Sequence, residues 1–374
     1  MEADGVVIGA GVIGLAAAAA LASRQRSPLV LERRGGVGQE VSSRNSEVIH
    51  AGLYYPPGTL KARTCVEGRE RLYQRCSEHR IPHRRTGKLV VATSPEELEG
   101  LSALAERALA NGAGAVELLS AGEVSRREPR IRALGALWSP ESGIVDAHAL
   151  VTSYQAEAEA HGAQIVLRTT VVALERDGDA WVVQTESAEG DRFSVRSPVV
   201  INAAGLSADR VAQSAGLDID RLGWRIHPCK GDYFAAAPSL GRLTERPVYP
   251  LPASGGLGIH VTPDLGGRYR LGPDVEYVDQ PRYDVDPQKA EPFAEAVARY
   301  LPEIRTEHLT PEFAGVRPKL QRPGEAFRDF VIEEGSAHGA PGLVNLIGIE
   351  SPGLTAAGAI AERVANWITG GSAL

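Results

Sequence analysis

Three glycines near the start of the chain constrain the fold more than any other feature. They form the run Gly9-Ala10-Gly11-Val12-Ile13-Gly14, which follows an apolar strand-like stretch from Val6 to Ile8. In such a run the first glycine permits a tight turn, the second lets the backbone approach a phosphate, and the third lets a helix pack on the strand. The following residues, Ile13 to Ser23, read as that helix, and Leu29 to Glu32 as a second strand. The sequence therefore predicts a βαβ unit that starts a doubly wound sheet.

The second strand ends in a carboxylate that suits a dinucleotide. Glu32 lies 23 positions after Gly9, where its side chain can accept the ribose hydroxyls. The first amides of the helix, at Val12 and Ile13, would face a pyrophosphate. These features predict a bound dinucleotide, and the glycine run by itself fits NAD as well as FAD.

Composition excludes several other classes of protein. With 374 residues and 43% hydrophobic content, the chain can bury a large core. Its formal charge is -7 and it has no long basic run, so a nucleic-acid partner is not expected. The three cysteines, Cys65, Cys76 and Cys229, lack metal-ligand spacing. We therefore predict no metal site, free thiols and a reducing compartment.

The apolar stretch from Gly5 to Ala22 resembles a signal peptide or a membrane span in composition. However, Glu2 and Asp4 precede it with no basic residue, and an export signal requires a positive segment there. Its three regularly spaced glycines are explained better by the dinucleotide turn. We predict no integral membrane segment and a cytoplasmic protein, with the periphery of the inner membrane as an alternative location.

The later segments predict two domains. The fold class expected is α/β: a Rossmann-like cofactor domain, discontinuous in sequence, with an inserted antiparallel-sheet substrate domain. We assign 1–85, 146–222 and 326–374 to the first domain, and 86–145 and 223–325 to the second. The main elements behind this division are helices at 60–79, 95–111, 148–161, 287–300 and 354–368, strands at 88–93, 199–201 and 343–347, and a hairpin turning at Asp177-Gly178.

Three further segments favour FAD over NAD. The second strand continues into a glycine-rich turn from Glu32 to Gly38, and the stretch from Val199 to Gly205 supplies a late strand-and-glycine element. A helix opened by Ser351-Pro352-Gly353 would direct its positive end at negative charge on a reduced flavin.

Two narrow motifs stand out in the chain, His50-Ala51-Gly52-Leu53-Tyr54-Tyr55 and Ile349 to Thr355, and broader ones include Gly258 to Pro263 and Ala314 to Arg317. Together these motifs resemble those of the L-2-hydroxyglutarate dehydrogenase family, within the D-amino-acid oxidase (DAO) superfamily of FAD-dependent oxidoreductases. Arg317 is followed by Pro318-Lys319, a variation on the family pattern. The resemblance implies a DAO-like fold, FAD as cofactor, and oxidation of a small 2-hydroxy acid, with L-2-hydroxyglutarate converted to 2-oxoglutarate.

The predicted cofactor contacts come from the glycine run, the segment after the second strand, the hairpin, the late strand and the C-terminal helix. They are Gly9, Gly11, Val12, Ile13, Gly14, Glu32, Arg33, Ser43, Arg44, Asn45, Ser46, His50, Ala51, Gly52, Val171, Val172, Ala203, Ala204, Gly205, Arg317, Glu350, Ser351, Pro352, Gly353, Leu354 and Thr355.

Oxidation of a 2-hydroxy acid needs a cation for the carboxylate and a base for the hydroxyl proton. Arg317 is the predicted cation, because its planar fork suits a carboxylate. His50 and His260 are rival candidates for the base, and the sequence does not order them. Two alternatives remain for these histidines: a purely structural role, or, for His50, a covalent tether to the flavin.

Four further residues are predicted to bind substrate. Tyr54 and Tyr55 could hydrogen-bond its oxygens, with a packing role as the alternative. Lys61 and Lys230 could hold the second carboxylate of a dicarboxylic acid, and surface charge is the alternative for each.

Two rival functions stay open at this point. The same fold could oxidise an amine or amino acid, because chemistry is decided by the site and not by the fold. The chain could also be a non-catalytic flavin subunit that transfers electrons, although it lacks cysteine-rich cluster motifs and a basic amphipathic helix. The expected partner is a small carboxylic acid, and the sequence leaves the electron acceptor open among a quinone, oxygen and an electron carrier.

Overall fold

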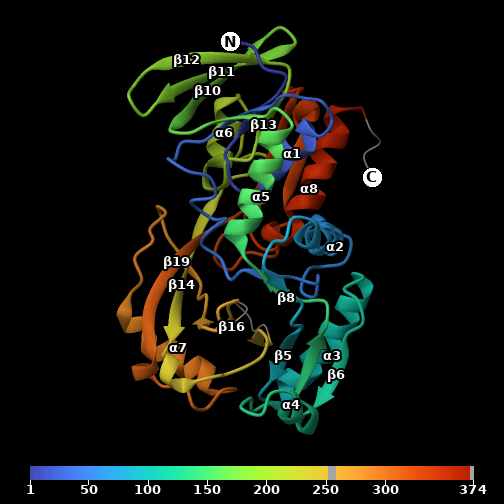
Figure 1. The fold of residues 1–374 in the computed structure, drawn as a ribbon, viewed down its shortest axis with the longest axis vertical. Helices are drawn as coiled ribbons and strands as arrows, with labels where there is room; N and C mark the ends of the chain where they lie inside the picture. Colours follow the sequence, from blue (N-terminus) through green and yellow to red (C-terminus); the bar gives the residue numbers. More distant parts are fainter. Residues whose placement is uncertain (252–257, 371–374) are drawn as a thin grey trace.

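The computed structural model describes residues 1–251 and 258–370. Two large sheets lie along the long axis of the molecule, one in the upper and one in the lower part of Figure 1. Within the described residues, no helix combines the length and the apolar character needed to cross a bilayer.

The upper sheet contains the predicted βαβ unit. Its central strands are parallel, and its edge strand β20 is antiparallel to β21. In order across the sheet the strands are β20 (Val331–Glu334), β21 (Leu343–Ile347), β13 (Val200–Asn202), β1 (Val6–Ile8), β2 (Leu29–Leu31) and β9 (Gln164–Val166). The expectation that the late strands near 200 and 345 rejoin the first sheet is confirmed.

Helices and a small sheet cover the two faces of the upper sheet. One core cluster joins it to α1 (Val12–Ala22), α2 (Leu60–Glu78), α5 (Ala147–Ala160) and α8 (Gly353–Ile368), which lie together in Figure 1. A second cluster joins it to α6 (Ala208–Ser214) and to an antiparallel sheet of β10 (Thr169–Asp177), β11 (Ala180–Ser187) and β12 (Arg192–Ser197). The predicted hairpin at Asp177-Gly178 is the connection between β10 and β11.

The lower sheet brings together two separate stretches of the chain. Its strands, in order, are β18 (Glu276–Tyr277), β14 (His227–Ala236), β17 (Tyr269–Leu271), β16 (Val261–Pro263), β15 (Val248–Pro250), β5 (Lys88–Ala92), β7 (Gly135–Ser139) and β6 (Glu117–Ser120), and β19 (Leu309–Lys319) pairs with β14. Its accompanying helices are α3 (Pro95–Ala110), α4 (Ala121–Arg127) and α7 (Ala290–Ala298).

One strand pair of the lower sheet corrects the expectation of an antiparallel domain. The strands β15 and β5 run parallel, and all other pairs in this sheet are antiparallel. These two strands belong to stretches far apart in the sequence, so no hairpin turn fixes their relative direction. The exact boundaries of the two predicted domains stay a prediction.

The two parts meet at a seam. A small sheet of β3 (Val48–Ile49), β8 (Gly143–Val145) and β4 (His83–Arg84) lies there, and the long strands β14 and β19 extend from this level into the lower part (Figure 1). At Gly315 in β19, an added Cβ would lie 2.3 Å from the carbonyl oxygen of Arg44. The lower sheet therefore touches the backbone of the segment that follows β2.

Short 3-10 helices lie between these elements, at 205–207, 238–240, 287–289, 306–308 and 335–338.

Candidate active site

The glycine run packs a strand, a helix and a second strand into direct backbone contact. Gly9 has a φ of +103°, and a Cβ there would lie 2.6 Å from the carbonyl oxygen of Ala203. A Cβ on Gly14 would lie 2.0 Å from the carbonyl oxygen of Gly9. Both positions therefore require glycine, and Gly14 serves helix packing, as the motif predicts.

The amino end of α1 is prepared for an anion. The Val12 amide donates to Ser42 Oγ at 2.9 Å, and the other amides of the first turn have no acceptor within the helix. The first turn holds no acidic residue that would occupy this positive end. A pyrophosphate fits these donors, which are the backbone amides of the predicted phosphate site.

Glu32 is held in place beside this helix end. Its two carboxylate oxygens accept from the amides of Ala10 and Arg34, each at 2.8 Å. Each oxygen keeps a lone pair for a further donor, so the group can also accept ribose hydroxyls. Next to it, Arg33 donates to Glu40 and to Ser207 Oγ.

A single cavity extends from the glycine run to the start of α8. The predicted cofactor residues that line it are Gly9, Gly11, Val12, Ile13, Glu32, Arg33, Arg44, Asn45, Ser46, His50, Val171, Ala203, Ala204, Gly205, Arg317, Glu350, Ser351, Pro352, Gly353 and Leu354. The predicted residues outside its lining are Gly14, Ser43, Ala51, Gly52, Val172 and Thr355. Val172 is 48% exposed, and it lies at an irregularity in the pairing of β10 with β11, between Val171 and Ala173.

The amino end of α8 closes the far side of the cavity. A Cβ on Gly68 of α2 would lie 2.4 Å from the carbonyl oxygen of Thr355, so α2 fixes the first turn of α8 by close packing. This turn also lacks acidic residues, and its free amides point their dipole at the end of the cavity. The cavity therefore has phosphate donors at one end and a positive helix end at the other. This arrangement fits FAD, which is elongated and gains negative charge on reduction.

His50 is anchored where the two parts meet. Its amide donates to Thr355 Oγ1 at 3.0 Å, and its Nε2 lies 3.3 Å from Ser351 Oγ. Burial, with a smaller contribution from the charge of Lys88, lowers the pKa of His50 to about 3. The imidazole is therefore neutral near pH 7 and keeps a lone pair on one ring nitrogen.

The rival histidine lines the same cavity. His260 is 4% exposed, and its ring stacks on that of Tyr249 with centroids 3.4 Å apart and planes at 6°. The structure thus places both candidate bases on one cavity, and either histidine can be the base.

Arg317 presents a guanidinium that backbone carbonyls hold in place. It donates to the carbonyl oxygens of Cys229, Lys230 and Asp274, at 3.3, 2.9 and 2.6 Å. Among residues 1–251 and 258–370 it makes no ion pair, although it lines the cavity. Its positive charge is therefore available to an anionic substrate.

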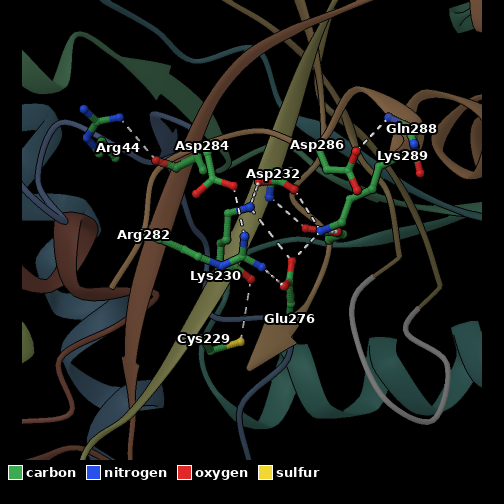
Figure 2. A network of polar contacts seen from close by, with 12 residues as sticks. Arg44, Cys229, Lys230, Asp232, Glu276, Arg282, Asp284, Asp286, Gln288 and Lys289 are labelled. Atoms are coloured by element: carbon green, nitrogen blue, oxygen red, sulfur yellow. Dashed lines mark hydrogen bonds and ion pairs between the residues drawn. The ribbon is translucent and has the colours of Figure 1, made fainter. Parts of the chain in front are cut away.

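A network of charged side chains supports these carbonyls. Lys289 Nζ lies 2.8 Å from Asp232, 2.8 Å from Asp274 and 2.6 Å from Glu276, and Figure 2 shows it reaching toward Asp232 and Glu276. Asp274 also accepts from the Asp232 amide at 2.7 Å. Because the Asp274 carbonyl receives Arg317, this network helps to hold the guanidinium in place.

The predicted substrate lysines are already paired. Lys61 lies 2.9 Å from Glu350, and Lys230 lies 2.8 Å from Asp232. Both are buried, and neither lines the cavity. Burial alone would raise the pKa of Glu350, but Lys61 and the neighbouring cations lower it to about 2. These protein carboxylates take the place of the substrate carboxylate that was predicted for each lysine.

The two predicted tyrosines differ in their partners. The hydroxyl of Tyr55 lies 3.4 Å from Ser351 Oγ, next to His50. The hydroxyl of Tyr54 is buried without a hydrogen-bond partner in the described part of the chain. Neither tyrosine lines the cavity.

Among the residues of this region that sequence reasoning missed, four bear on the chemistry of the site. Ser42 caps α1, and Tyr233 and Tyr249 line the cavity from β14 and β15. Lys88 is fully buried at the start of β5, beside the Tyr54 and Tyr249 rings. Only Lys88 had a signal in the sequence: a charged residue that opens an otherwise apolar strand, Leu89 to Ala92.

The family comparison agrees with this geometry. A family model described as FAD dependent oxidoreductase (DAO) matches residues 4–367. The mitochondrial L-2-hydroxyglutarate dehydrogenase of Arabidopsis thaliana is 41% identical, with 97% of this chain and 83% of that protein covered. The human mitochondrial L-2-hydroxyglutarate dehydrogenase is 30% identical, with 97% and 88% covered.

Solved structures show the same fold. An FAD-bound L-alpha-glycerophosphate oxidase from Mycoplasma pneumoniae superposes with a TM-score of 0.89 at 26% identity, covering 99% of this chain and 95% of that one. Glycine oxidase from Geobacillus kaustophilus gives 0.84 at 21% identity, covering 99% and 95%. The predicted fold class and the FAD cofactor are confirmed. The chain belongs to the FAD dependent oxidoreductase (DAO) family and, within it, to the L-2-hydroxyglutarate dehydrogenases.

Proposed function

We propose that this enzyme oxidises L-2-hydroxyglutarate to 2-oxoglutarate. The observation that carries the proposal is a single cavity that joins an unpaired guanidinium, Arg317, to a neutral imidazole, His50, at the end of a dinucleotide site. An anionic 2-hydroxy acid needs both groups, one for its carboxylate and one for its hydroxyl proton. The names of the relatives supply the particular acid.

Each group has a definite task in this proposal. Arg317 holds the C1 carboxylate, and its own position is fixed by three backbone carbonyls. His50 or His260 takes the hydroxyl proton as the C–H bond at C2 breaks. When bound, FAD supplies the acceptor for the hydride that leaves C2.

Oxidation of an amine is the competing proposal. The fold does not choose between the two, because a glycerophosphate oxidase and a glycine oxidase both share it. A neutral amine needs no base to lose its hydride, whereas a hydroxyl must give up a proton, and two histidines on the cavity therefore favour the alcohol. A non-catalytic electron-transfer subunit would have no use for Arg317 and two histidines on one cavity.

Anaerobic mixing of the FAD-loaded enzyme with L-2-hydroxyglutarate tests the proposal. The flavin absorption band near ~450 nm should bleach at millimolar substrate. L-glutamate is the matched control, because it replaces the hydroxyl by an amine on the same carbon skeleton. A band that persists with the hydroxy acid, or that bleaches faster with L-glutamate, would show that the proposed substrate is wrong.

The acceptor and the location extend the proposal. Cys65, Cys76 and Cys229 are free and buried, which fits any reducing compartment, and we propose the cytoplasm as the location. We propose that the electrons pass from the reduced enzyme to a quinone, oxygen or an electron carrier, and the periphery of the inner membrane is the alternative location. Reoxidation rates of the bleached enzyme with each acceptor would identify the physiological class.

A further inference from the structure

Lys88 differs from every other lysine of this chain in its surroundings. The sequence contains five lysines, and Lys61, Lys230, Lys289 and Lys319 each pair with a carboxylate within 3.1 Å. Lys88 is 0% exposed and has no ion pair or hydrogen-bond partner for Nζ in the residues that the structure describes. A buried cation without a partner is costly, so its presence calls for a functional reason.

Two other buried polar atoms without partners belong to residues around this ammonium. The Tyr54 hydroxyl and His50 Nδ1 also lack a hydrogen-bond partner among the described residues. Lys88 Nζ lies 4.7 Å from the Tyr54 ring centroid and 4.6 Å from that of Tyr249. An ammonium and a phenol are donors, and neutral imidazole can donate from Nδ1. A group of donors without acceptors suits an anion.

The position of Lys88 in the sheet places this group on the substrate side of the molecule. Tyr249 of β15 pairs with Val90 of β5, and side chains two residues apart along a strand share a face. Lys88 and Tyr249 therefore lie on the same face, and Tyr249 lines the cavity together with His50 and His260. Lys88 is not itself in the cavity lining but contacts the ring of Tyr249, which is, so binding involves side-chain adjustment, which is common when a backbone stays fixed.

We propose that Lys88, assisted by Tyr54, forms the subsite for the second carboxylate of the dicarboxylic substrate. This inference rests on the proposed function, and it assigns to Lys88 the role that Lys61 and Lys230 cannot fill while they are paired with protein carboxylates. Arg317 then holds the carboxylate next to the reacting carbon, and Lys88 selects acids that carry a second one. Such a site discriminates strongly, because a substrate without the second carboxylate leaves the ammonium unpaired.

The titration of Lys88 adds a pH dependence. Burial lowers the pKa of Lys88 to about 7, and the charged or titratable groups that face it are His50, Cys65, Tyr54 and Tyr249. The free enzyme loses this charge as the pH rises through 7, so kcat/KM for a dicarboxylate should fall above that pH. A monocarboxylate that does not use Lys88 should not show this fall.

The test compares two substrates of matched shape in wild type and in Lys88→Met. L-2-hydroxyglutarate and L-2-hydroxyvalerate share one carbon skeleton and differ by the second carboxylate. Methionine keeps the length of lysine without its charge. We expect Lys88→Met to lower kcat/KM for the dicarboxylate by about 100-fold and to change that for L-2-hydroxyvalerate by less than about 3-fold. Tyr54→Phe should give a smaller loss, about 5-fold, again confined to the dicarboxylate.

Two controls separate this role from a structural one. Lys61→Met removes another buried lysine, but one that is paired with Glu350, so it should lower kcat/KM for both acids by a similar factor. The Tm of Lys88→Met should stay level or rise, because an uncompensated buried charge has been removed. The fall of the dicarboxylate kcat/KM above pH 7 should disappear in the same variant.

The outcomes distinguish this inference from the proposed function. If wild type fails to use L-2-hydroxyglutarate, the proposed function is wrong and this inference fails with it. If wild type uses it, but Lys88→Met slows both acids by the same factor, Lys88 acts through His50 or through the fold, and the subsite is wrong.

Discussion

The two ends of the active-site cavity differ in the groups that form them, which are backbone at one end and charged side chains at the other. The cofactor end consists of backbone: glycines in close contact with carbonyls, and the free amides at the start of α1. The substrate end consists of side-chain charge, with Arg317 unpaired by any carboxylate and Lys88 without a partner in the described residues. The first end depends on local steric rules, whereas the second depends on which distant side chains the lower sheet brings together. Substitutions at the two ends should therefore affect different properties: FAD content at the first end and kcat/KM at the second.

The largest effect should come from the cofactor end. Gly14→Ala places a Cβ 2.0 Å from the Gly9 carbonyl, which neither backbone can avoid without separating α1 from β1. We expect the variant to lose bound FAD almost completely, as measured by the ratio of flavin to protein absorbance after purification. Gly5→Ala is the matched control, because nothing lies within 4 Å of the added Cβ. If Gly14→Ala retained FAD like this control, the backbone account of the cofactor end would be wrong.

The next effect should leave the cofactor in place. Arg317→Met removes the guanidinium without enlarging the side chain, so FAD should remain bound at the wild-type ratio. Steady-state kcat/KM for L-2-hydroxyglutarate should fall about 1000-fold, because the C1 carboxylate loses a desolvated charged partner. Arg317→Lys should recover little of this, since an ammonium cannot reach the three carbonyls that fix the guanidinium fork. A loss of FAD in Arg317→Met would show that the two ends are not separable.

A smaller effect should identify the base. Separate His50→Asn and His260→Asn variants should be compared by the rate of anaerobic flavin reduction. We expect a decrease of about 100-fold for at least one of them, because a positioned base contributes roughly that factor. If both variants reduce the flavin at the wild-type rate, neither histidine is the base.

The difference between the two ends also explains what the sequence could predict. Gly9, Gly14 and Glu32 act through neighbours in a short βαβ unit, so their spacing predicted this unit and a dinucleotide cofactor correctly, and their individual contacts to FAD stay a prediction. The position of α8 at the far end was also expected, although its fixation by Gly68 was not. Motifs identified Arg317, His50 and His260 as one group, and the structure places all three on one cavity.

The predictions for lysine show where sequence reasoning ended. Lys61 and Lys230 were chosen without knowledge of their partners, and Glu350 lies 289 positions away from Lys61 in the sequence. Lys88 was missed because its isolation depends on the parallel pairing of β5 with β15, which join stretches far apart in the chain. No local pattern shows whether a buried cation has a counter-charge, because tertiary contacts decide it.

The contact between Gly315 and the Arg44 carbonyl affects how the molecule can move. A Cβ on Gly315 would lie 2.3 Å from the Arg44 carbonyl oxygen, so the upper and lower parts are in close backbone contact beside the cavity. A hinge motion that opens the upper part away from the lower part would need a pivot at another place, or it would break this contact. Entry of substrate and exit of product are then expected to rely on the rearrangement of a few rings, and turnover should be insensitive to solvent viscosity that slows the motion of whole lobes.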